Sequence, residues 1–146
     1  MEEGEADIPS AIDAVLPLIE VEFKDKEIEI SQVIERNLPL IKGSQPLVQA
    51  VLLNLLTNAC QAAGRSGRVE IAAEVVAERV RVSVRDNGPG IPEGMRKQIF
   101  EPFFTTKKGT GSGLGLYLVK QFVERMGGAI SVESKEGEGT VFTLEF

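Results

Sequence analysis

The sequence contains no histidine among its 146 residues, and this absence excludes several kinds of chemistry. Without an imidazole, the chain cannot form a Ser–His–Asp triad or a metal site with histidine ligands. It also offers no histidine of its own that could accept a phosphoryl group. Any reaction that needs a histidine must therefore obtain it from a different domain or chain.

Cysteine is almost as scarce, because Cys60 is the only one. A single thiol cannot form an internal disulfide, which suits a reducing compartment and leads us to expect a cytoplasmic location, although a longer parent protein could be membrane-anchored. Cys60 lies in an apolar run, so we expect it to be a small buried side chain. That run is interrupted by Asn54, Thr57 and Asn58, and no stretch reaches the roughly 20 apolar residues of a transmembrane helix. The acidic start, MEEGEAD, has the wrong sign for a signal peptide.

Positive charge is in deficit, with 16 lysine and arginine residues against 22 aspartate and glutamate residues. The resulting net charge of −6 repels a phosphate backbone, so we expect no binding to nucleic acid. A bound nucleotide would need a local cation, either a metal ion or a few placed basic side chains. Hydrophobic residues make up 42% of the chain, which is enough for one domain with a core.

Hydrophobic periodicity and turn residues predict the order helix, two strands, helix, two strands, loop, helix, two strands. We expect residues 1–7 to be a linker or the edge of the chain and residues 8–146 to form one domain. Hairpin strands with separate helices indicate an α/β two-layer sandwich with a mixed sheet. The predicted helices cover residues 8–19, with Pro17 ending or bending the first, then 44–63, 92–100 and 114–126; the predicted strands cover 26–31, 38–41, 68–76, 79–85, 129–133 and 140–146.

The predicted helix over 44–63 has a polar stripe. Asn54, Thr57, Asn58 and Gln61 follow at i, i+3, i+4 and i+7, a spacing that places them on one helix face. The stripe could simply face water, as in any amphipathic helix. It could also line a ligand site, because the neutral amide oxygen of asparagine can coordinate a hard cation such as Mg²⁺. The spacing alone leaves both interpretations open.

Two glycine-rich segments follow. The first, DNGPGI from Asp86 to Ile91, comes directly after a predicted strand, where a carboxylate could accept a hydrogen bond from an exocyclic amine; the alternative is an ordinary Asx turn. The second, GTGSGLG from Gly109 to Gly115, runs into a predicted amphipathic helix, which favours an anion site over a flexible linker. It is neither a P-loop nor a G-x-G-x-x-G motif. Lys107 and Lys108 precede it and could reach a terminal phosphate or only aid solubility.

Together and in this order, these segments resemble the boxes of the catalytic domain of sensor histidine kinases, in the ATPase superfamily that includes gyrase B, the ninety-kilodalton heat-shock chaperones and MutL. The N box is LLNLLTNACQAA, the G1 box RDNGPGI, the F box FEPFFTTK, the G2 box GTGSGLGL and the last glycine box GEGT. The resemblance runs from about Asp7 to the C-terminus, and FEPFFTTK with GSGLGLYLVK is most similar to the nitrogen-regulation-like kinases. One departure is Gln45, where the family often has an acidic residue.

The resemblance implies a Bergerat-type ATP-binding fold, with a mixed, mostly antiparallel sheet covered on one face by three helices. It also implies a role for each matched residue. Asn58 would be the Mg²⁺ ligand, Asn54 would help to hold the metal and phosphates, and Lys107 would contact phosphate, these three being the catalytic residues. Asp86 would bind the adenine amino group with support from Thr140. The other implied ATP contacts are Gln61, Ala62, Gly88, Gly90, Ile91, Phe103, Thr106, Gly109, Gly111, Ser112, Gly113, Leu114, Gly115 and Leu116, and residues 101–112 would form a lid anchored by Phe103 and Phe104.

Position 54 separates hydrolysis from transfer. The hydrolases of this superfamily carry a glutamate there, one helical turn before the magnesium ligand, as a general base for water. Asn54 cannot take up a proton, so the sequence predicts transfer of the phosphoryl group to a supplied nucleophile. In the family that nucleophile is a histidine on a separate, N-terminal dimerisation domain of the same protein.

The resemblance therefore implies a protein-histidine kinase that uses ATP and Mg²⁺, with a response regulator downstream. We expect the isolated domain to be monomeric and the parent protein to be a homodimer. Two alternatives remain open. One is an anti-sigma-factor-like serine kinase, which shares the fold and the boxes. The other is a non-catalytic, nucleotide-gated interaction module.

Overall fold

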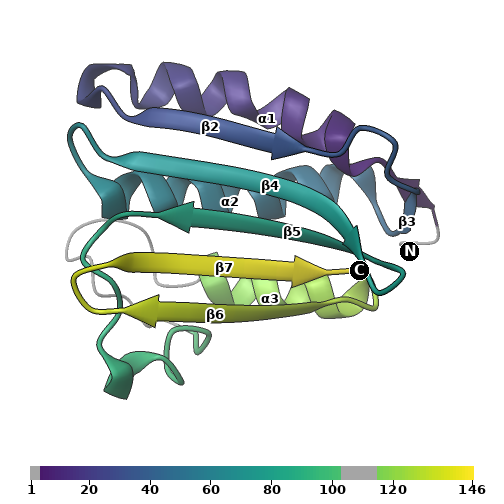
Figure 1. The fold of residues 1–146 in the computed structure, drawn as a ribbon. Helices are drawn as coiled ribbons and strands as arrows, with labels where there is room; N and C mark the ends of the chain where they lie inside the picture. The colour runs from purple at the N-terminus through teal and green to yellow at the C-terminus, as the bar shows by residue number, and fades with distance from the viewer. Residues whose placement is uncertain (1–3, 103–114) are drawn as a thin grey trace.

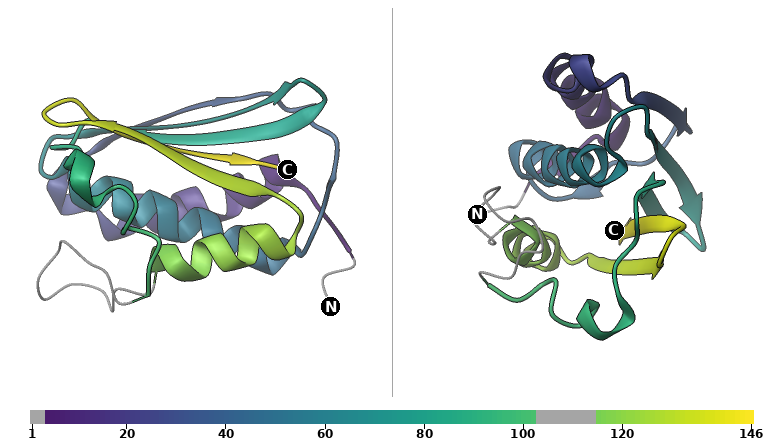
Figure 2. Two further views of the ribbon diagram at one scale, coloured as in Figure 1. Left: turned by 90° about the horizontal axis from the view of Figure 1, so that it is seen from below. Right: turned by 90° about the vertical axis from the view of Figure 1, so that its left-hand side faces the viewer.

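The computed structural model describes residues 4–102 and 115–146 and has two layers, a five-stranded sheet and three helices on one of its faces (Figures 1 and 2). The strand order in the sheet is β2-β4-β5-β7-β6, in which β2 pairs with β4 in parallel and every other pair is antiparallel. This confirms the predicted fold class. The elements of the sheet and its helices are α1 (Ile8–Glu22), β2 (Glu29–Ile34), α2 (Gln45–Ala63), β4 (Arg68–Val76), β5 (Arg79–Asp86), α3 (Gly115–Arg125), β6 (Ala129–Lys135) and β7 (Gly139–Glu145).

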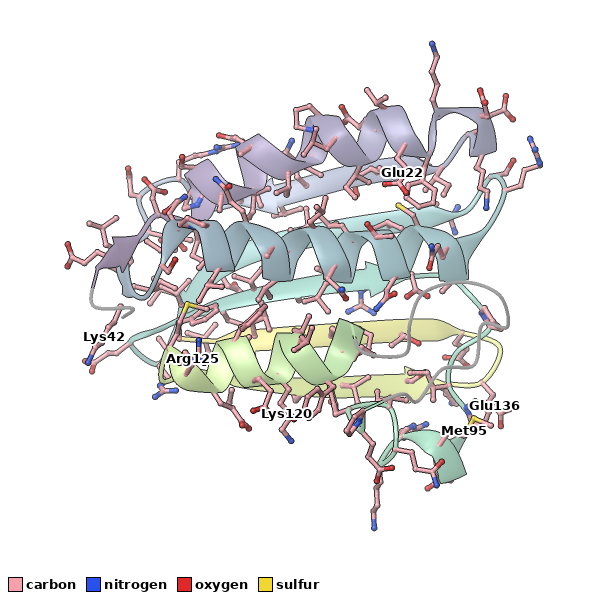
Figure 3. The ribbon with its side chains drawn as sticks, turned by 180° about the vertical axis from the view of Figure 1, so that it is seen from behind. Glu22, Lys42, Met95, Lys120, Arg125 and Glu136 are labelled. Carbon is pink, nitrogen blue, oxygen red and sulfur yellow. The ribbon has the colours of Figure 1, made fainter. Side chains whose placement is uncertain are left out.

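The core lies between the sheet and the helices, and α2 runs through its middle, between α1 and α3 (Figure 3). This position explains why α2 is apolar on most of its circumference, with Leu52, Leu55 and Leu56 completely buried. Each such side chain contributes about 1.5–3 kcal/mol of hydrophobic free energy. On β5, Val80, Val82 and Val84 alternate into the same core, so that the residues between them point to the open face of the sheet.

The first helix is longer than predicted. Pro17 was expected to end or bend it, but α1 continues to Glu22 and is closed by a hydrogen bond from the Phe23 N–H to the Ile19 carbonyl. A proline inside a helix removes one backbone hydrogen bond, here to Asp13, four residues earlier. Asp13 and Pro17 both lie on the exposed face of α1, where water can donate a hydrogen bond to the Asp13 carbonyl in place of the missing N–H.

Three other predicted elements differ from the structure. The strand predicted at 26–31 begins only at Glu29, because the 3₁₀ helix η1 (Lys24–Lys26) and the left-handed backbone of Glu27, with φ of 55°, precede it. The strand predicted at 38–41 is reduced to β3 (Ile41–Lys42), outside the main sheet. The helix predicted at 92–100 is the short 3₁₀ helix η2 (Glu93–Met95) followed by turns with i→i+3 hydrogen bonds.

Part of the segment predicted to be a linker takes part in regular structure. The strand β1 (Glu5–Ala6) pairs with β3 in an antiparallel ladder. The Gln45 side chain accepts a hydrogen bond from the Asp7 N–H at 2.7 Å and donates one to the Asp7 carbonyl at 3.1 Å. An acidic side chain could only accept, so glutamine suits this double contact. The domain boundary at residue 7 stays a prediction. Among the described residues, none of the helices has the length and apolarity to cross a membrane.

Cys60 is completely buried on α2, as predicted. Burial raises the pKa of its thiol from its ordinary value of 9.0 to about 11, and the negative charges of Glu22 and Asp86 act in the same direction.

This raised pKa predicts a loss of stability at high pH. The folded state holds the thiol proton more tightly than the unfolded state, so the contribution is fully present below pH 9 and is lost as the pH rises towards 11. The expected loss is about 1.4 kcal/mol by pH 10. The measurement is urea unfolding of the wild type and Cys60→Ala between pH 8 and pH 10. The titration of lysines and other groups common to both proteins drops out of the difference between their unfolding free energies. Identical pH dependence of the two proteins would contradict this assignment.

Candidate functional site

Two asparagines of α2 form the first part of the site. Asn54 and Asn58 lie one helical turn apart and half-buried, and Asn58 Nδ2 donates a hydrogen bond to Asn54 Oδ1 at 3.4 Å. Thr57 is half-buried beside them, whereas Gln61 at the end of the stripe is exposed. The stripe therefore does not simply face water over its whole length.

The start of α3 lies directly against Asn54, one member of this asparagine pair. A Cβ atom added to Gly115 would stand 2.8 Å from Asn54 Nδ2, closer than real Cβ contacts allow. Glycine at this position therefore lets the α3 backbone approach the amide. The first turn of a helix carries unpaired N–H groups and a positive partial charge, so the arrangement places amide oxygens and an anion-attracting helix start side by side. Leu116, the next residue, is half-buried and packs against the core.

The second part of the site lies where β5 ends and β7 begins. Asp86 and Thr140 are directly opposite each other in the β5–β7 ladder, and each is only 5% exposed. They are the two buried polar residues of the described chain. One oxygen of Asp86 accepts the Gly88 N–H at 2.8 Å, so the Asx turn considered as an alternative is present. A carboxylate has about four acceptor positions, and this bond therefore does not exhaust its capacity.

Close backbone contacts join the two parts. A Cβ atom on Gly88 would lie 2.5 Å from the carbonyl oxygen of Ala62, one turn beyond Asn58 on α2. A Cβ atom on Gly139 would lie 2.0 Å from the carbonyl oxygen of Asp86. Both contacts require glycine, and they hold the turn after β5 between the end of α2 and the start of β7.

The rest of the turn is fastened to the β6–β7 hairpin. Gly90 has φ of 81°, and a Cβ atom there would lie 2.5 Å from the Lys135 carbonyl oxygen. The Ile91 N–H donates to Ser134 Oγ at 2.7 Å. Ser134 Oγ in turn lies 2.9 Å from Thr140 Oγ1. Ile91 is therefore connected to Thr140 through the Ser134 side chain, and Gly90 lies against the backbone of the same hairpin; both are predicted site residues.

The sequence motifs did not identify three residues of this arrangement. Asn87 Oδ1 accepts the Arg68 N–H at 2.8 Å and ties the turn to the start of β4. Arg96 donates from its guanidinium to the Ser134 carbonyl. Ser134 itself is 43 residues from Ile91 in the sequence, so no local pattern indicates their contact. Only Asn87 had a local signal, because it follows Asp86 directly at the end of a predicted strand.

The remaining predicted residues lie outside the described part of the chain. They are Phe103, Phe104, Thr106, Lys107, Lys108, Gly109, Gly111, Ser112, Gly113 and Leu114.

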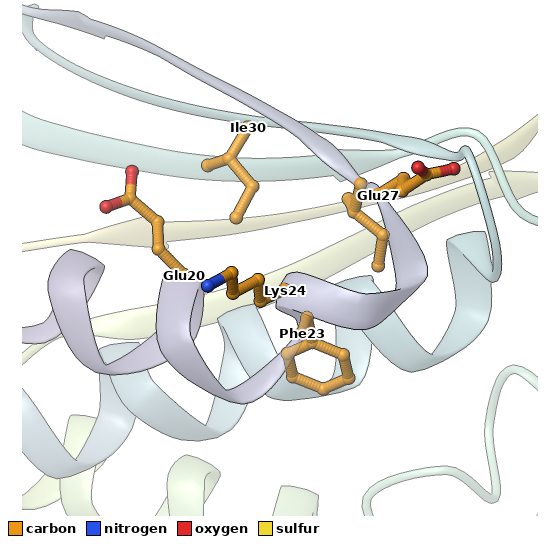
Figure 4. Close-up of a pocket in the computed structure, with 6 residues that line it drawn as sticks. Glu20, Phe23, Lys24, Glu27 and Ile30 are labelled. Atoms are coloured by element: carbon orange, nitrogen blue, oxygen red, sulfur yellow. The ribbon is translucent and has the colours of Figure 1, made fainter.

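Two hollows occur on the described surface. One of about 240 Å³ lies at the end of the β5–β7–β6 strands and is lined in part by Asp86, Ser134 and Thr140. The other, of about 250 Å³, lies between the end of α1, η1 and β2 (Figure 4). Its lining, which includes Glu20, Phe23 and Lys24, contains none of the residues that the motifs single out. The first hollow is therefore the one connected with the buried polar pair.

Comparison with known proteins decides the family. Residues 43–146, more than half of the chain, match the family described as histidine kinase-, DNA gyrase B-, and HSP90-like ATPase. The chain belongs to this ATPase family. Both parts of the site, from Asn54 to Thr140, lie within the matched region.

Relatives in this ATPase family include the sensor histidine kinase ZraS of Escherichia coli (strain K12), which is 39% identical over 138 residues, covering 94% of this chain and 30% of ZraS. The chain thus spans less than a third of the length of such relatives. The nucleotide-free catalytic domain of histidine kinase ThkA superimposes with a TM-score of 0.88 at 36% identity, over 100% of this chain and 95% of that one.

Two further family structures contain bound molecules. Full-length ShkA in complex with AMPPNP has a TM-score of 0.87 at 34% identity, over 99% of this chain and 31% of ShkA. ThkA in complex with the response regulator protein TrrA has a TM-score of 0.82 at 32% identity, over 98% of this chain and 41% of that one.

Proposed function

We propose that this chain binds Mg-ATP and donates the γ-phosphate to a histidine on a separate dimerisation domain, as the catalytic part of a protein-histidine kinase in two-component signalling. The observation that carries the proposal is that one site contains both a buried carboxylate, Asp86, and the half-buried asparagines of α2. The close backbone contact between Gly88 and Ala62 holds these two parts together. Such a site offers an acceptor for a base at one end and amide oxygens near a helix start at the other.

The base end suits adenine. Adenine presents an exocyclic amine, and the Asp86 carboxylate can accept its hydrogen bond in a poorly hydrated place, where such bonds discriminate strongly. Thr140 lies opposite and adds a second polar group. The glycines at 88 and 139 let backbone approach backbone there and so define the width of the pocket.

The phosphate end suits a hard cation. The Asn58 amide oxygen is the proposed Mg²⁺ ligand, with Asn54 positioning it through their mutual hydrogen bond. When bound, Mg²⁺ would offset the negative charge of the phosphates. Phosphate contacts by Lys107 and the glycines at 109–115 complete the proposal, and the N-terminal turn of α3 beside Asn54 supports an anion in this place.

Catalysis would consist mainly of positioning and charge stabilisation. A histidine of the dimerisation domain attacks the γ-phosphorus in line, the bond between that phosphorus and the bridging oxygen breaks, and ADP leaves. Asn54 cannot act as a general base, so water is not activated and hydrolysis stays slow. A response regulator would then receive the phosphoryl group. The assignment of relatives such as ZraS as sensor histidine kinases and the solved complex of ThkA with TrrA support these partners, and the single buried cysteine suits a cytoplasmic location.

Phosphotransfer to a supplied histidine domain tests the proposal. Incubated with radiolabelled Mg-ATP and the dimerisation domain of its own parent protein, the chain is expected to label that domain, and acid is expected to remove the label. Asn58→Ala should lower the labelling rate by about tenfold or more, because a charge-assisted oxygen contact to the metal–phosphate unit is lost. Asn37→Ala, at an exposed loop asparagine, serves as the control and should label normally.

Each other outcome identifies an alternative. An acid-stable label would indicate a serine kinase of the anti-sigma-factor type. Failure of the wild type to bind Mg-ATP in calorimetry would indicate a non-catalytic module. Binding of Mg-ATP without any transfer to the cognate domain would overturn the kinase assignment.

A further inference from the structure

Ser134, near the end of β6, is the meeting point of three hydrogen bonds. Its hydroxyl accepts from the Ile91 N–H at 2.7 Å, donates to the Gly139 carbonyl at 3.0 Å and lies 2.9 Å from Thr140 Oγ1. The side chain is half-buried and points to the same face of the sheet as Thr140.

The proton count of these groups sets the direction of the third bond. A serine hydroxyl has one proton and two lone pairs. The Ile91 N–H can only donate, so it takes one lone pair, and the Gly139 carbonyl can only accept, so it takes the proton. The remaining lone pair of Ser134 must accept from Thr140. The Thr140 hydroxyl has then spent its own proton and presents only acceptor lone pairs to the space beside Asp86.

We infer that Ser134 is a specificity-determining positioning residue, which makes the base pocket an all-acceptor surface by holding the Thr140 hydroxyl proton away from it. On this side of the pocket the Asp86 carboxylate and the Thr140 hydroxyl both act as acceptors, which favours a hydrogen-bond donor on the base or a bound water. The amine at position six of adenine is such a donor, whereas the oxo group of hypoxanthine at the same position is an acceptor. This inference rests on the proposed function, because it assigns the selectivity of that same pocket.

Removal of the Ser134 hydroxyl should change the selectivity of the pocket as well as its affinity. In Ser134→Ala, the Thr140 hydroxyl is free to rotate and can donate to an oxo group. The ratio of the dissociation constants for Mg-ITP and Mg-ATP is therefore expected to fall about fivefold relative to wild type, in line with one neutral hydrogen bond. If Ser134 had a purely structural role, Ser134→Ala would weaken the binding of both nucleotides equally and leave this ratio unchanged.

The experiment measures both dissociation constants by calorimetry for a matched set of variants. Ser134→Thr keeps a hydroxyl and should restore the wild-type ratio. Ser131→Ala removes an exposed serine from the same strand and should leave the ratio unchanged. Thr140→Val removes the hydroxyl that Ser134 orients, so adding Ser134→Ala to it should produce no further change in the ratio.

The outcomes distinguish this inference from the proposed function. An unchanged ratio in folded Ser134→Ala, or an equal effect of Ser134→Ala with and without Thr140→Val, overturns the role of Ser134 alone. Should Ser134→Ala not fold, Thr140→Val carries the test, because a ratio equal to that of wild type in Thr140→Val overturns the inference as well. A wild type that binds no Mg-ATP overturns the proposed function and this inference with it.

Discussion

Replacement of Asp86 by asparagine is expected to raise the dissociation constant of Mg-ATP by about a hundredfold or more while preserving the fold. Asparagine has nearly the same shape, and its carbonyl oxygen can still accept the Gly88 N–H that Asp86 binds at 2.8 Å. The second oxygen, however, becomes an NH₂ group. Facing the adenine amine, it sets donor against donor in a place where Asp86 is only 5% exposed, so water cannot relieve the mismatch.

The matched control for this variant is Asp13→Asn. Asp13 lies on the exposed face of α1 and pairs with Arg36 at 2.8 Å, with both side chains 53% exposed. A surface pair of this kind contributes at most about 1 kcal/mol, and it is remote from the buried pair, so ATP binding should be unchanged. Calorimetry with Mg-ATP checks both variants, and circular dichroism checks their folding. Binding by folded Asp86→Asn within about threefold of wild type would refute the assignment of Asp86 to the base.

Gly139→Ala is expected to cost about 3 kcal/mol or more of unfolding free energy, the largest effect on stability that we predict. Gly139 has φ of 112°, and its added Cβ would lie 2.0 Å from the Asp86 carbonyl oxygen. The obstacle is backbone, which cannot rotate away as a side chain could. Relief would require β5 and β7 to separate where they form the base pocket, so the variant should also bind ATP poorly.

Two other glycines separate steric overlap from backbone strain. Gly137 has φ of 83° but nothing within 4 Å of an added Cβ, so Gly137→Ala should cost only the strain of about 1 kcal/mol. Gly94 has neither a neighbour within 4 Å nor a positive φ, and its replacement should change stability by less than about 0.5 kcal/mol. Urea unfolding of the three alanine variants measures these losses, which are expected to be largest at Gly139, smaller at Gly137 and smallest at Gly94. Equal losses for Gly139→Ala and Gly137→Ala would show that the close approach to Asp86 does not matter.

Local patterns predicted the elements whose pairing is local. The hairpin of β4 and β5 coincides with the strands predicted at 68–76 and 79–85, and its turn at Ala77 and Glu78 adopts φ of 53° and 68° although neither residue is a glycine. The spacing of Asn54 and Asn58 likewise predicted neighbours on one helix face, which the structure contains. In both cases the determining contacts lie within a few residues along the chain.

Features that depend on distant segments were not predictable in this way. The strand β3 looked like a member of the main sheet from its apolar residues, but it pairs with β1, about 36 residues earlier. Residues 92–100 have apolar spacing compatible with a helix, yet the segment is held by contacts such as that between Arg96 and Ser134 and forms only η2. The role of Ser134 depends on three partners, among them Ile91 and Thr140, that no periodic pattern connects.

The position of the buried polar pair has a consequence for the order of folding. Asp86 ends the β4–β5 hairpin and Thr140 is the second residue of β7 within the β6–β7 hairpin, so each hairpin can form from local contacts. Their juxtaposition requires closure of a loop of 54 residues, which costs more chain entropy and is slower than either hairpin turn. Nascent hairpins therefore carry the two halves of the base pocket separately, and nucleotide can stabilise only the late, closed state of the chain.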